Sequence, residues 1–223
     1  MNTPLNVSSL RQQVYDYLRT EMLNGELTPG STINLAQIAQ RLGISKTPLR
    51  DALIHLELEG FVTILPRRGV RVNTLELTDV EYAYDAVGVV EAAIVTDCFE
   101  KIQDHHIAEL KSLNAKMIHD IQHNDFSHLF QTNLAFHNVF VELSDNSLLK
   151  DFIHPIKYRL YDFQGHHYIP DWELRNCHEH EQFIQALEEK DARKAAGIMK
   201  DVHWSYQVQQ QFIKQFYAMT ESR

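Results

Sequence analysis

The chain has 223 residues, a net charge of −9 and an apolar fraction of 44%, which is ordinary for a globular protein and excludes intrinsic disorder. Its two cysteines, Cys98 and Cys177, are too few for a disulfide framework and are not spaced as zinc ligands. No apolar run reaches the length of a membrane span, and the first residues lack a secretory pattern. We therefore expect a reduced, cytoplasmic protein without a membrane partner.

Charge and histidine are unevenly distributed along the chain. Residues 1–75 hold 8 Lys and Arg against 6 Asp and Glu, a balance of +2, whereas residues 76–223 hold 13 against 24, a balance of −11. Twelve of the 13 histidines also lie in the second segment. This asymmetry predicts two parts with different partners. Any affinity for nucleic acid should reside in the first part, because the acidic second part repels it.

The first segment predicts three helices followed by a hairpin. Apolar residues recur at helical spacing over residues 8–27, 33–43 and 44–60. Side chains that can cap these helices stand at each start, namely Ser8 or Ser9, Asn34, and Ser45 or Thr47. Residues 61–75 then indicate two short strands around a Pro-Arg-Arg-Gly tip. Two short helices joined by LGIS and followed by a hairpin are typical of a winged helix-turn-helix.

The chemistry of this first segment suits DNA. The start of the third helix presents hydrogen-bond donors from Ser45, Lys46, Thr47 and Arg50, and a helix N-terminus favours phosphate. Arg50 has the fork that pairs with a guanine edge in the major groove. The hairpin tip brings together side chains for a phosphate backbone or a minor groove: Arg67, Arg68 and Gly69.

The second segment reads as helix almost throughout. From Thr78 onward the helical pattern breaks only near 104, 124–125, 144–147, 165–171 and 190–191. It predicts an all-α bundle of six or seven helices without a convincing strand. We expect the domain boundary near residues 74–78, which divides the chain into domains 1–75 and 76–223.

One short stretch of the second segment, TNLAFHNVF at residues 132–140, poses a chemical question. Asn133 and His137 stand one helical turn apart on an apolar face, where polar groups cost free energy unless a partner satisfies them. Residues further along the chain must supply that partner.

The first segment resembles the DNA-binding domain of the GntR family of bacterial transcriptional regulators. The resemblance is carried by MLNGELTPG, LAQIAQRLGISKTPLRDAL and LELEGFVTILPRRGVRV and covers nearly all of residues 8–73. It implies that the recognition-helix start and the wing tip contact DNA. Many members have Arg where this chain has Lys46, and Lys lacks the planar bidentate fork of Arg.

The second segment is similar to the FCD domain of the FadR subfamily. VVEAAIV, NLAFHNVFVELSDNSLL and HEQFIQALEEKDARKAAGIMKDVH carry this looser resemblance. It implies a helical bundle around a ligand cavity that holds a divalent metal, zinc or nickel being the best match for such ligands. The implied metal ligands are Asn133, His137, His180 and His203. The family histidine falls at Val202, about 100° around the helix from His203, so a local adjustment or a three-ligand site is expected.

The resemblance also implies a small-molecule effector, with an organic acid as one class. FCD domains often carry an Arg one turn before the position of Glu91, where it clamps a carboxylate. This chain has Val87 there. Tyr84 and Tyr158 are the nearby polar alternatives, and Arg159 is the remaining candidate cation. The expected effector pocket therefore contains Tyr84, Glu91 and Arg159.

Together these features predict a metabolite-responsive transcriptional regulator, most simply a repressor. Two copies would pair as a homodimer on a palindromic double-stranded operator. A metal-dependent enzyme with a DNA-binding head is one alternative, although no HExxH motif and no nucleophile–base pairing are legible. A constitutive DNA-binding protein whose second domain only dimerises is another.

Overall fold

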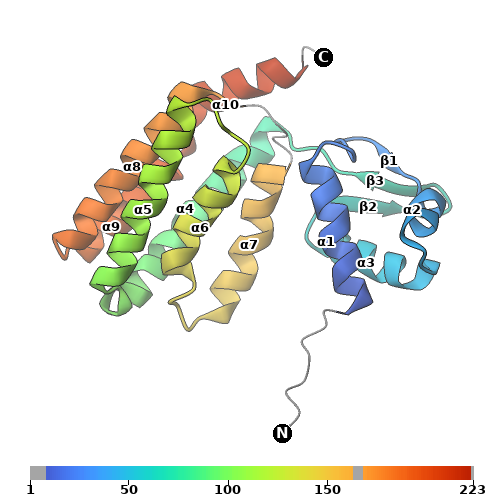
Figure 1. The fold of residues 1–223 in the computed structure, drawn as a ribbon, viewed down its shortest axis with the longest axis horizontal. Coiled ribbons are helices and arrows are strands. Elements are labelled where there is room, and N and C mark those ends of the chain that lie inside the picture. Colours follow the sequence, from blue (N-terminus) through green and yellow to red (C-terminus); the bar gives the residue numbers. More distant parts are fainter. Residues whose placement is uncertain (1–8, 163–167, 222–223) are drawn as a thin grey trace, which may run out of the picture. The chain divides into compact units, whose positions relative to one another are not determined.

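The computed structural model describes residues 9–162 and 168–221 (Figure 1). The chain divides into two compact units. The first contains residues 9–75 and the segment that begins at Tyr158, and the second contains Glu76–Lys157 and residues 168–221. Each unit has its own hydrophobic core.

The first unit is a winged helix-turn-helix, as the sequence predicts. Its three strands form one antiparallel sheet in the order β1-β3-β2 (Figure 1). The elements are α1 (Leu10–Leu23), β1 (Thr32–Ile33), α2 (Leu35–Leu42), α3 (Lys46–Leu58), β2 (Val62–Leu65) and β3 (Gly69–Val72). The two-residue strand β1, which pairs Thr32 with Arg71, is absent from the sequence prediction because it is too short to show a period of two.

Local signals explain where these helices begin and end. The Ser9 side chain accepts a hydrogen bond from the Gln12 amide at the start of α1, and Asn34 does the same for Gln37 at the start of α2. Gly43 ends α2 in the left-handed conformation, with φ of 65°, which glycine adopts at little cost. The apolar faces of the three helices and the hairpin then close one core around Leu18, Leu53 and Phe61.

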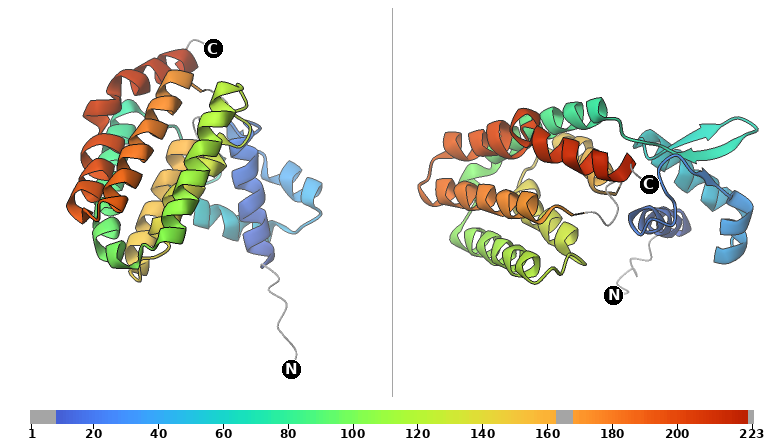
Figure 2. Two further views of the ribbon diagram at one scale, coloured as in Figure 1. Left: turned by 60° about the vertical axis from the view of Figure 1, so that its left-hand side comes forward. Right: turned by 90° about the horizontal axis from the view of Figure 1, so that it is seen from above.

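The second unit contains only helices among its described residues (Figures 1 and 2). Seven α-helices follow one another: α4 (Leu77–Cys98), α5 (Asp104–Gln122), α6 (Leu129–Val141), α7 (Ser147–Asp162), α8 (Pro170–Glu188), α9 (Ala192–Ile198) and α10 (Tyr206–Glu221). A 3-10 turn η1 (Phe99–Lys101) and a π-helical turn η2 (Met199–His203) interrupt the series. None of the helices described in either unit is both long and apolar enough to span a bilayer.

Two packing contacts position the centre described below. Helix α5 lies against α6 and α8, while α4 lies against α9 and η2. Gly88 of α4 permits the second contact, since a Cβ there would lie 3.1 Å from the Trp204 Cβ and 3.3 Å from the Lys200 carbonyl oxygen. The close approach brings the middle of α4 to the turn that carries His203.

Candidate metal centre and nucleic-acid interface

The N-terminus of α3 presents the predicted DNA-contacting side chains to solvent. Ser45 is the N-cap residue, yet its hydroxyl makes no capping bond. Lys46, Thr47 and Arg50 are exposed in the first turns of the helix. Their donors are thus available on one helix end, where the backbone amides add partial positive charge.

The wing tip is a tight turn that exposes two arginines. The Arg68 amide donates to the Leu65 carbonyl oxygen at 3.0 Å, and Arg67 and Gly69 both have positive φ, 61° and 96°. Arg67 and Arg68 are exposed. Within residues 9–162 and 168–221, no ion pair engages these two arginines, or Lys46 and Arg50 at the start of α3. The basic groups of both elements are therefore uncompensated, as a phosphate-contacting surface requires.

Three buried histidines meet inside the second unit. His137 of α6, His180 of α8 and His203 of η2 bring ring nitrogens within 4.8 Å of one another. The exposed fractions are 0%, 0% and 5%. The helices that carry them are far apart in sequence, so the cluster exists only in the folded bundle.

Each imidazole is held at Nδ1 by an oxygen from a neighbouring side chain. Nδ1 of His137 lies 2.9 Å from Glu91 Oε2, and Nδ1 of His203 lies 3.0 Å from Glu179 Oε2. Nδ1 of His180 lies 3.1 Å from Asn114 Oδ1. Asn114 is oriented in turn by its amide group, which donates to the Cys177 carbonyl oxygen at 3.0 Å.

These partners determine the tautomer of each histidine. An ionised carboxylate only accepts hydrogen bonds, and the Asn114 oxygen also only accepts, so all three Nδ1 atoms carry the proton. Each Nε2 atom is therefore left with a lone pair. The Nε2 atoms of His137 and His180 are buried without a hydrogen-bond partner. Orphaned buried acceptors of this kind need an explanation. These two, together with the lone pair of the neighbouring His203, fit the donor set of a metal ion.

The π-helical turn provides the local adjustment that His203 needs. Its i→i+5 geometry is seen in the bond from the Trp204 amide to the Met199 carbonyl oxygen, at 2.9 Å. Such a turn inserts one residue relative to an α-helix, and π-turns occur often at functional sites. The insertion offsets the one-residue displacement from Val202 to His203, and it turns the imidazole toward His137 and His180.

A buried ion pair supports the centre, and sequence analysis missed its cation. Lys157 Nζ lies 2.7 Å from Glu91 Oε1, and the Trp204 indole donates to Glu91 Oε2 at 2.7 Å. Lys157 is 1% exposed. Its place on the same helical face as Ile153 and Leu160, both buried, was a signal in the sequence, because a lysine on an apolar face needs a carboxylate.

The electrostatics keep the imidazoles of His137 and His180 neutral. Burial lowers the pKa of His137 to about 4 despite the nearby Glu91 charge, and it lowers the pKa of His180 well below its usual value. Burial alone would raise the pKa of Glu91, but His137 and Lys157 outweigh it and hold that pKa below its ordinary value. At neutral pH the centre thus contains the neutral imidazoles of His137 and His180 beside an ionised, hydrogen-bonded Glu91.

The other predicted residues differ in burial and in the unit to which they belong. Asn133 is half-buried one turn before His137 on α6. Tyr84 is buried, with its ring 5.2 Å from the Trp204 ring. Arg159 belongs to the α7 segment grouped with the first unit, whereas Lys157, two residues earlier, is the cation bonded to Glu91. Sequence analysis also missed Asn114 and Glu179, because residues that orient a ligand carry no spacing rule of their own.

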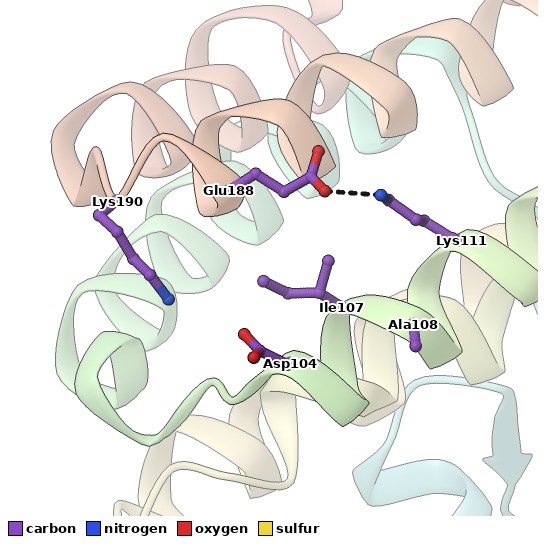
Figure 3. Close-up of a pocket in the computed structure, with 6 residues that line it drawn as sticks. All are labelled: Asp104, Ile107, Ala108, Lys111, Glu188 and Lys190. Atoms are coloured by element: carbon purple, nitrogen blue, oxygen red, sulfur yellow. Dashed lines mark hydrogen bonds and ion pairs between the residues drawn. The ribbon is translucent and has the colours of Figure 1, made fainter.

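A separate hollow lies on the outer side of α5 and α8 (Figure 3). The Lys111 ammonium and the Glu188 carboxylate are 2.6 Å apart beside it, and Asp104 and Lys190 line its other side (Figure 3). None of the three clustered histidines lines it. Its groups are solvated surface charges, so it does not compete with the buried centre as the candidate site.

Comparison with known families matches both units. The model of the bacterial regulatory proteins of the gntR family matches residues 10–72, and that of the FCD domain matches residues 82–203. The transcriptional repressor RspR of Escherichia coli (strain K12) is 24% identical over 199 residues, which cover 86% of this chain and 85% of that protein. The uncharacterized regulator YdhC of Bacillus subtilis (strain 168) is 24% identical over 187 residues, 82% and 83% of the two chains.

Solved structures show the same fold. That of E. coli McbR/YncC covers 96% of this chain and 100% of its own, with a TM-score of 0.77 at 21% identity. A GntR regulator structure from Rhodococcus sp. RHA1 covers 95% and 99%, with a TM-score of 0.70 at 16% identity. Both comparisons run over the full succession of winged head and helical bundle.

Proposed function

The chain belongs to the GntR family of bacterial regulatory proteins and carries an FCD domain, and we infer from this that it is a DNA-binding transcriptional regulator and not an enzyme. We propose that a metal-assisted small-molecule site in the second unit controls its activity as a regulator. Its relatives are described as transcriptional regulators, and RspR as a repressor. We infer repression here as well, in the cytoplasm, where the operator is.

The observation that carries the proposal is the set of convergent Nε2 lone pairs at His137, His180 and His203. A divalent ion, zinc or nickel by ligand preference, would be held by these three atoms, with Asn133 or water completing the set. When bound, the ion supplies a Lewis-acidic position that attracts oxygen ligands.

Charge favours an anionic effector at that position. The imidazoles are neutral and leave the charge of the ion in place. The Glu91 carboxylate is paired with Lys157, and Glu179 accepts a hydrogen bond from Arg175 at 3.1 Å. A carboxylate effector would therefore neutralise an otherwise uncompensated ion, which takes over part of the role of the arginine replaced by Val87.

DNA binding is assigned to the exposed groups of α3 and the wing. Ser45, Lys46, Thr47 and Arg50 would enter a major groove, and Arg67, Arg68 and Gly69 would contact the neighbouring backbone or minor groove. One recognition helix reads too few base pairs for useful specificity, so we infer a homodimer on a palindromic operator. An effector would shift the population between DNA-binding and non-binding forms.

Elemental analysis tests the metal assignment. Wild-type protein purified without chelator should hold about one equivalent of zinc or nickel, and the His137→Ala/His180→Ala double variant should hold none. His178→Ala is the matched control, because that exposed histidine of α8 bonds only to Glu181 in the described structure. Equal metal content in wild type and double variant would return these histidines to a purely structural role.

Operator titration tests the regulatory assignment. The metal-loaded protein is titrated against a candidate operator with and without small carboxylates. A change in operator affinity that disappears in the double variant supports effector control. An affinity that responds to none of a broad panel favours the constitutive alternative.

A further inference from the structure

One buried glutamine connects the C-terminal helix to the histidine centre. Gln209 lies in the first turn of α10 and is 0% exposed, although glutamine is found mostly on protein surfaces. Helix α10 contacts α4 and the π-helical turn η2. A buried amide costs free energy unless its oxygen and its nitrogen are both satisfied, so the partners of this side chain show what it holds in place.

The two ends of the amide have partners of opposite kind. The Trp172 indole donates to Gln209 Oε1 at 3.0 Å, and Gln209 Nε2 donates to both carboxylate oxygens of Glu179 at 2.9 Å. An indole N–H can only donate, and an ionised carboxylate can only accept. These partners therefore fix the orientation of the amide, which could otherwise turn over and exchange its donor with its acceptor.

The first route from Gln209 to the centre runs through a side chain. Glu179 is buried, and its Oε2 atom accepts a hydrogen bond from His203 Nδ1 at 3.0 Å. This bond leaves the lone pair of His203 on Nε2, the atom that a metal would bind. Arg175 binds Oε1 of the same carboxylate from a side chain that is 42% exposed. Gln209 is thus a fully buried donor that holds Glu179 in position for His203.

The second route runs through the backbone. Gln209 Nε2 also lies 3.3 Å from the carbonyl oxygen of Val202 and 3.4 Å from that of His203. Carbonyl groups at the end of a helix lack partners in a following turn, and these two belong to the last residues of η2. An amide nitrogen has two protons, which suffice for the carboxylate and for this pair of carbonyls. The same side chain therefore supports both the turn that carries His203 and the carboxylate that orients its ring.

We propose that Gln209 is a positioning residue for the metal ligand His203 and that it couples α10 to the metal centre. This inference rests on the proposed metal site and adds a regulatory element to it. If the contacts of Gln209 raise the affinity of the centre for zinc, bound zinc must stabilise those contacts by the same factor, because coupling between two sites is reciprocal. Metal loading would thus order α10, and metal loss would loosen it.

Zinc affinity tests the positioning role. Full-length, metal-free protein is titrated with zinc in competition with a fluorescent chelator. Gln209→Met keeps the approximate size of the side chain and removes the amide, so it should bind zinc about tenfold more weakly than wild type, at the lower end of the range for residues that orient a metal ligand. Gln211→Met is the matched control, because Gln211 is an exposed glutamine of the same helix, and it should bind zinc as wild type does.

Hydrogen exchange separates positioning from a purely structural role. Exchange of the α10 amides is measured on each protein with and without zinc. In wild type, zinc should slow this exchange by about tenfold, the counterpart of the change in zinc affinity. In Gln209→Met, that zinc-dependent protection should be lost. A residue that only packed α10 against the bundle would change the exchange equally with and without zinc.

A second variant guards against misfolding of the methionine variant. Trp172→Phe keeps an aromatic ring beside Phe212, whose ring centroid is 6.0 Å from that of Trp172, and removes the indole donor that fixes the amide. It should weaken zinc binding by a smaller factor than Gln209→Met.

The measurements also distinguish two kinds of failure. Unchanged zinc affinity in Gln209→Met, or in Trp172→Phe if the methionine variant does not fold, overturns the inference. Exchange of α10 that does not respond to zinc in wild type overturns it as well. Failure of wild type to bind zinc at all contradicts the metal site itself.

Discussion

Replacement of Lys157 by methionine should destabilise the second unit strongly. The change keeps the length of the side chain but removes the cation that lies 2.7 Å from the Glu91 carboxylate. Glu91 would remain buried with two neutral donors, Trp204 at 2.7 Å and His137 at 2.9 Å. Removing one partner of a buried ion pair costs about 3–5 kcal/mol, a large share of a typical total stability of about 5–15 kcal/mol.

The cost should depend on pH with a definite sign. In wild type the pKa of Glu91 is depressed, so its pairing stabilises the folded state above the unfolded pKa and is lost as pH falls through the lowered folded pKa. Without Lys157 the carboxyl group protonates more readily. The difference between the variant and wild type should therefore be largest near pH 7–8 and shrink toward pH 4.

Urea denaturation followed by tryptophan fluorescence measures this effect. Both tryptophans, Trp172 and Trp204, lie in the second unit, so the signal reports on that unit alone. Lys111→Met is the control, because it breaks an ion pair with Glu188 whose side chains are 53% and 48% exposed and should cost less than about 1 kcal/mol. If Lys157→Met costs no more than this control, or if its cost is the same at both pH values, the buried pair does not hold the centre together.

Three further predictions concern other parts of the chain. Arg50→Ala should weaken specific operator binding by about 1–3 kcal/mol if Arg50 reads a base. The control Arg193→Ala, which changes an exposed arginine of α9, should alter operator binding little. Gel-shift titrations against operator and random duplex measure both effects, and unchanged discrimination between the two duplexes would refute base reading. Gly43→Ala should lower the free energy of unfolding by about 1 kcal/mol through the positive φ alone, because a Cβ there meets nothing within 4 Å. Gly43→Asn should lower it by less. Equal melting temperatures for the wild type and the two variants would contradict this. Glu173→Gln should leave the free energy of unfolding unchanged at pH 4 and raise it by at most about 3 kcal/mol at pH 8. The reason is that the pKa of Glu173 rises from 4.5 to about 7 on folding, so the wild-type protein loses stability as pH rises between these two values. Parallel urea titrations at pH 4 and pH 8 check the sign.

The winged helix-turn-helix could be predicted from the sequence because the residues that determine it act locally. Asn34 caps α2 through a bond to an amide three residues away, and Gly43 ends the same helix through its own backbone conformation. Neither depends on the rest of the fold. The apolar faces of α1 and α3 follow the helical period, so their burial was also predictable. The exception, β1, is defined only by its partner β3.

The histidine centre could be predicted from the sequence only in part. His137 was identified from its place on an apolar helical face, and His180 from the family resemblance. Neither observation locates the partners. Asn114, Glu179 and Lys157 orient or balance the centre through contacts across 24 to 66 residues of sequence, and no periodicity in one helix reports what another helix will place against it.

The sequence by itself determined where the helices of the first unit begin and end and that the second unit is helical. It also determined which side chains are available. These features depend on residues within a turn or two of one another. Only the tertiary structure decided that His203 joins His137 and His180. An ideal α-helix would turn its imidazole about 100° away. The π-helical turn Met199–His203 corrects this, and it is held by the contact of α4 through Gly88 and by the bond from Trp204 to Glu91. An α-helix tolerates such a distortion only when packing against other parts of the fold offsets its cost in free energy. That packing is a property of the assembled bundle.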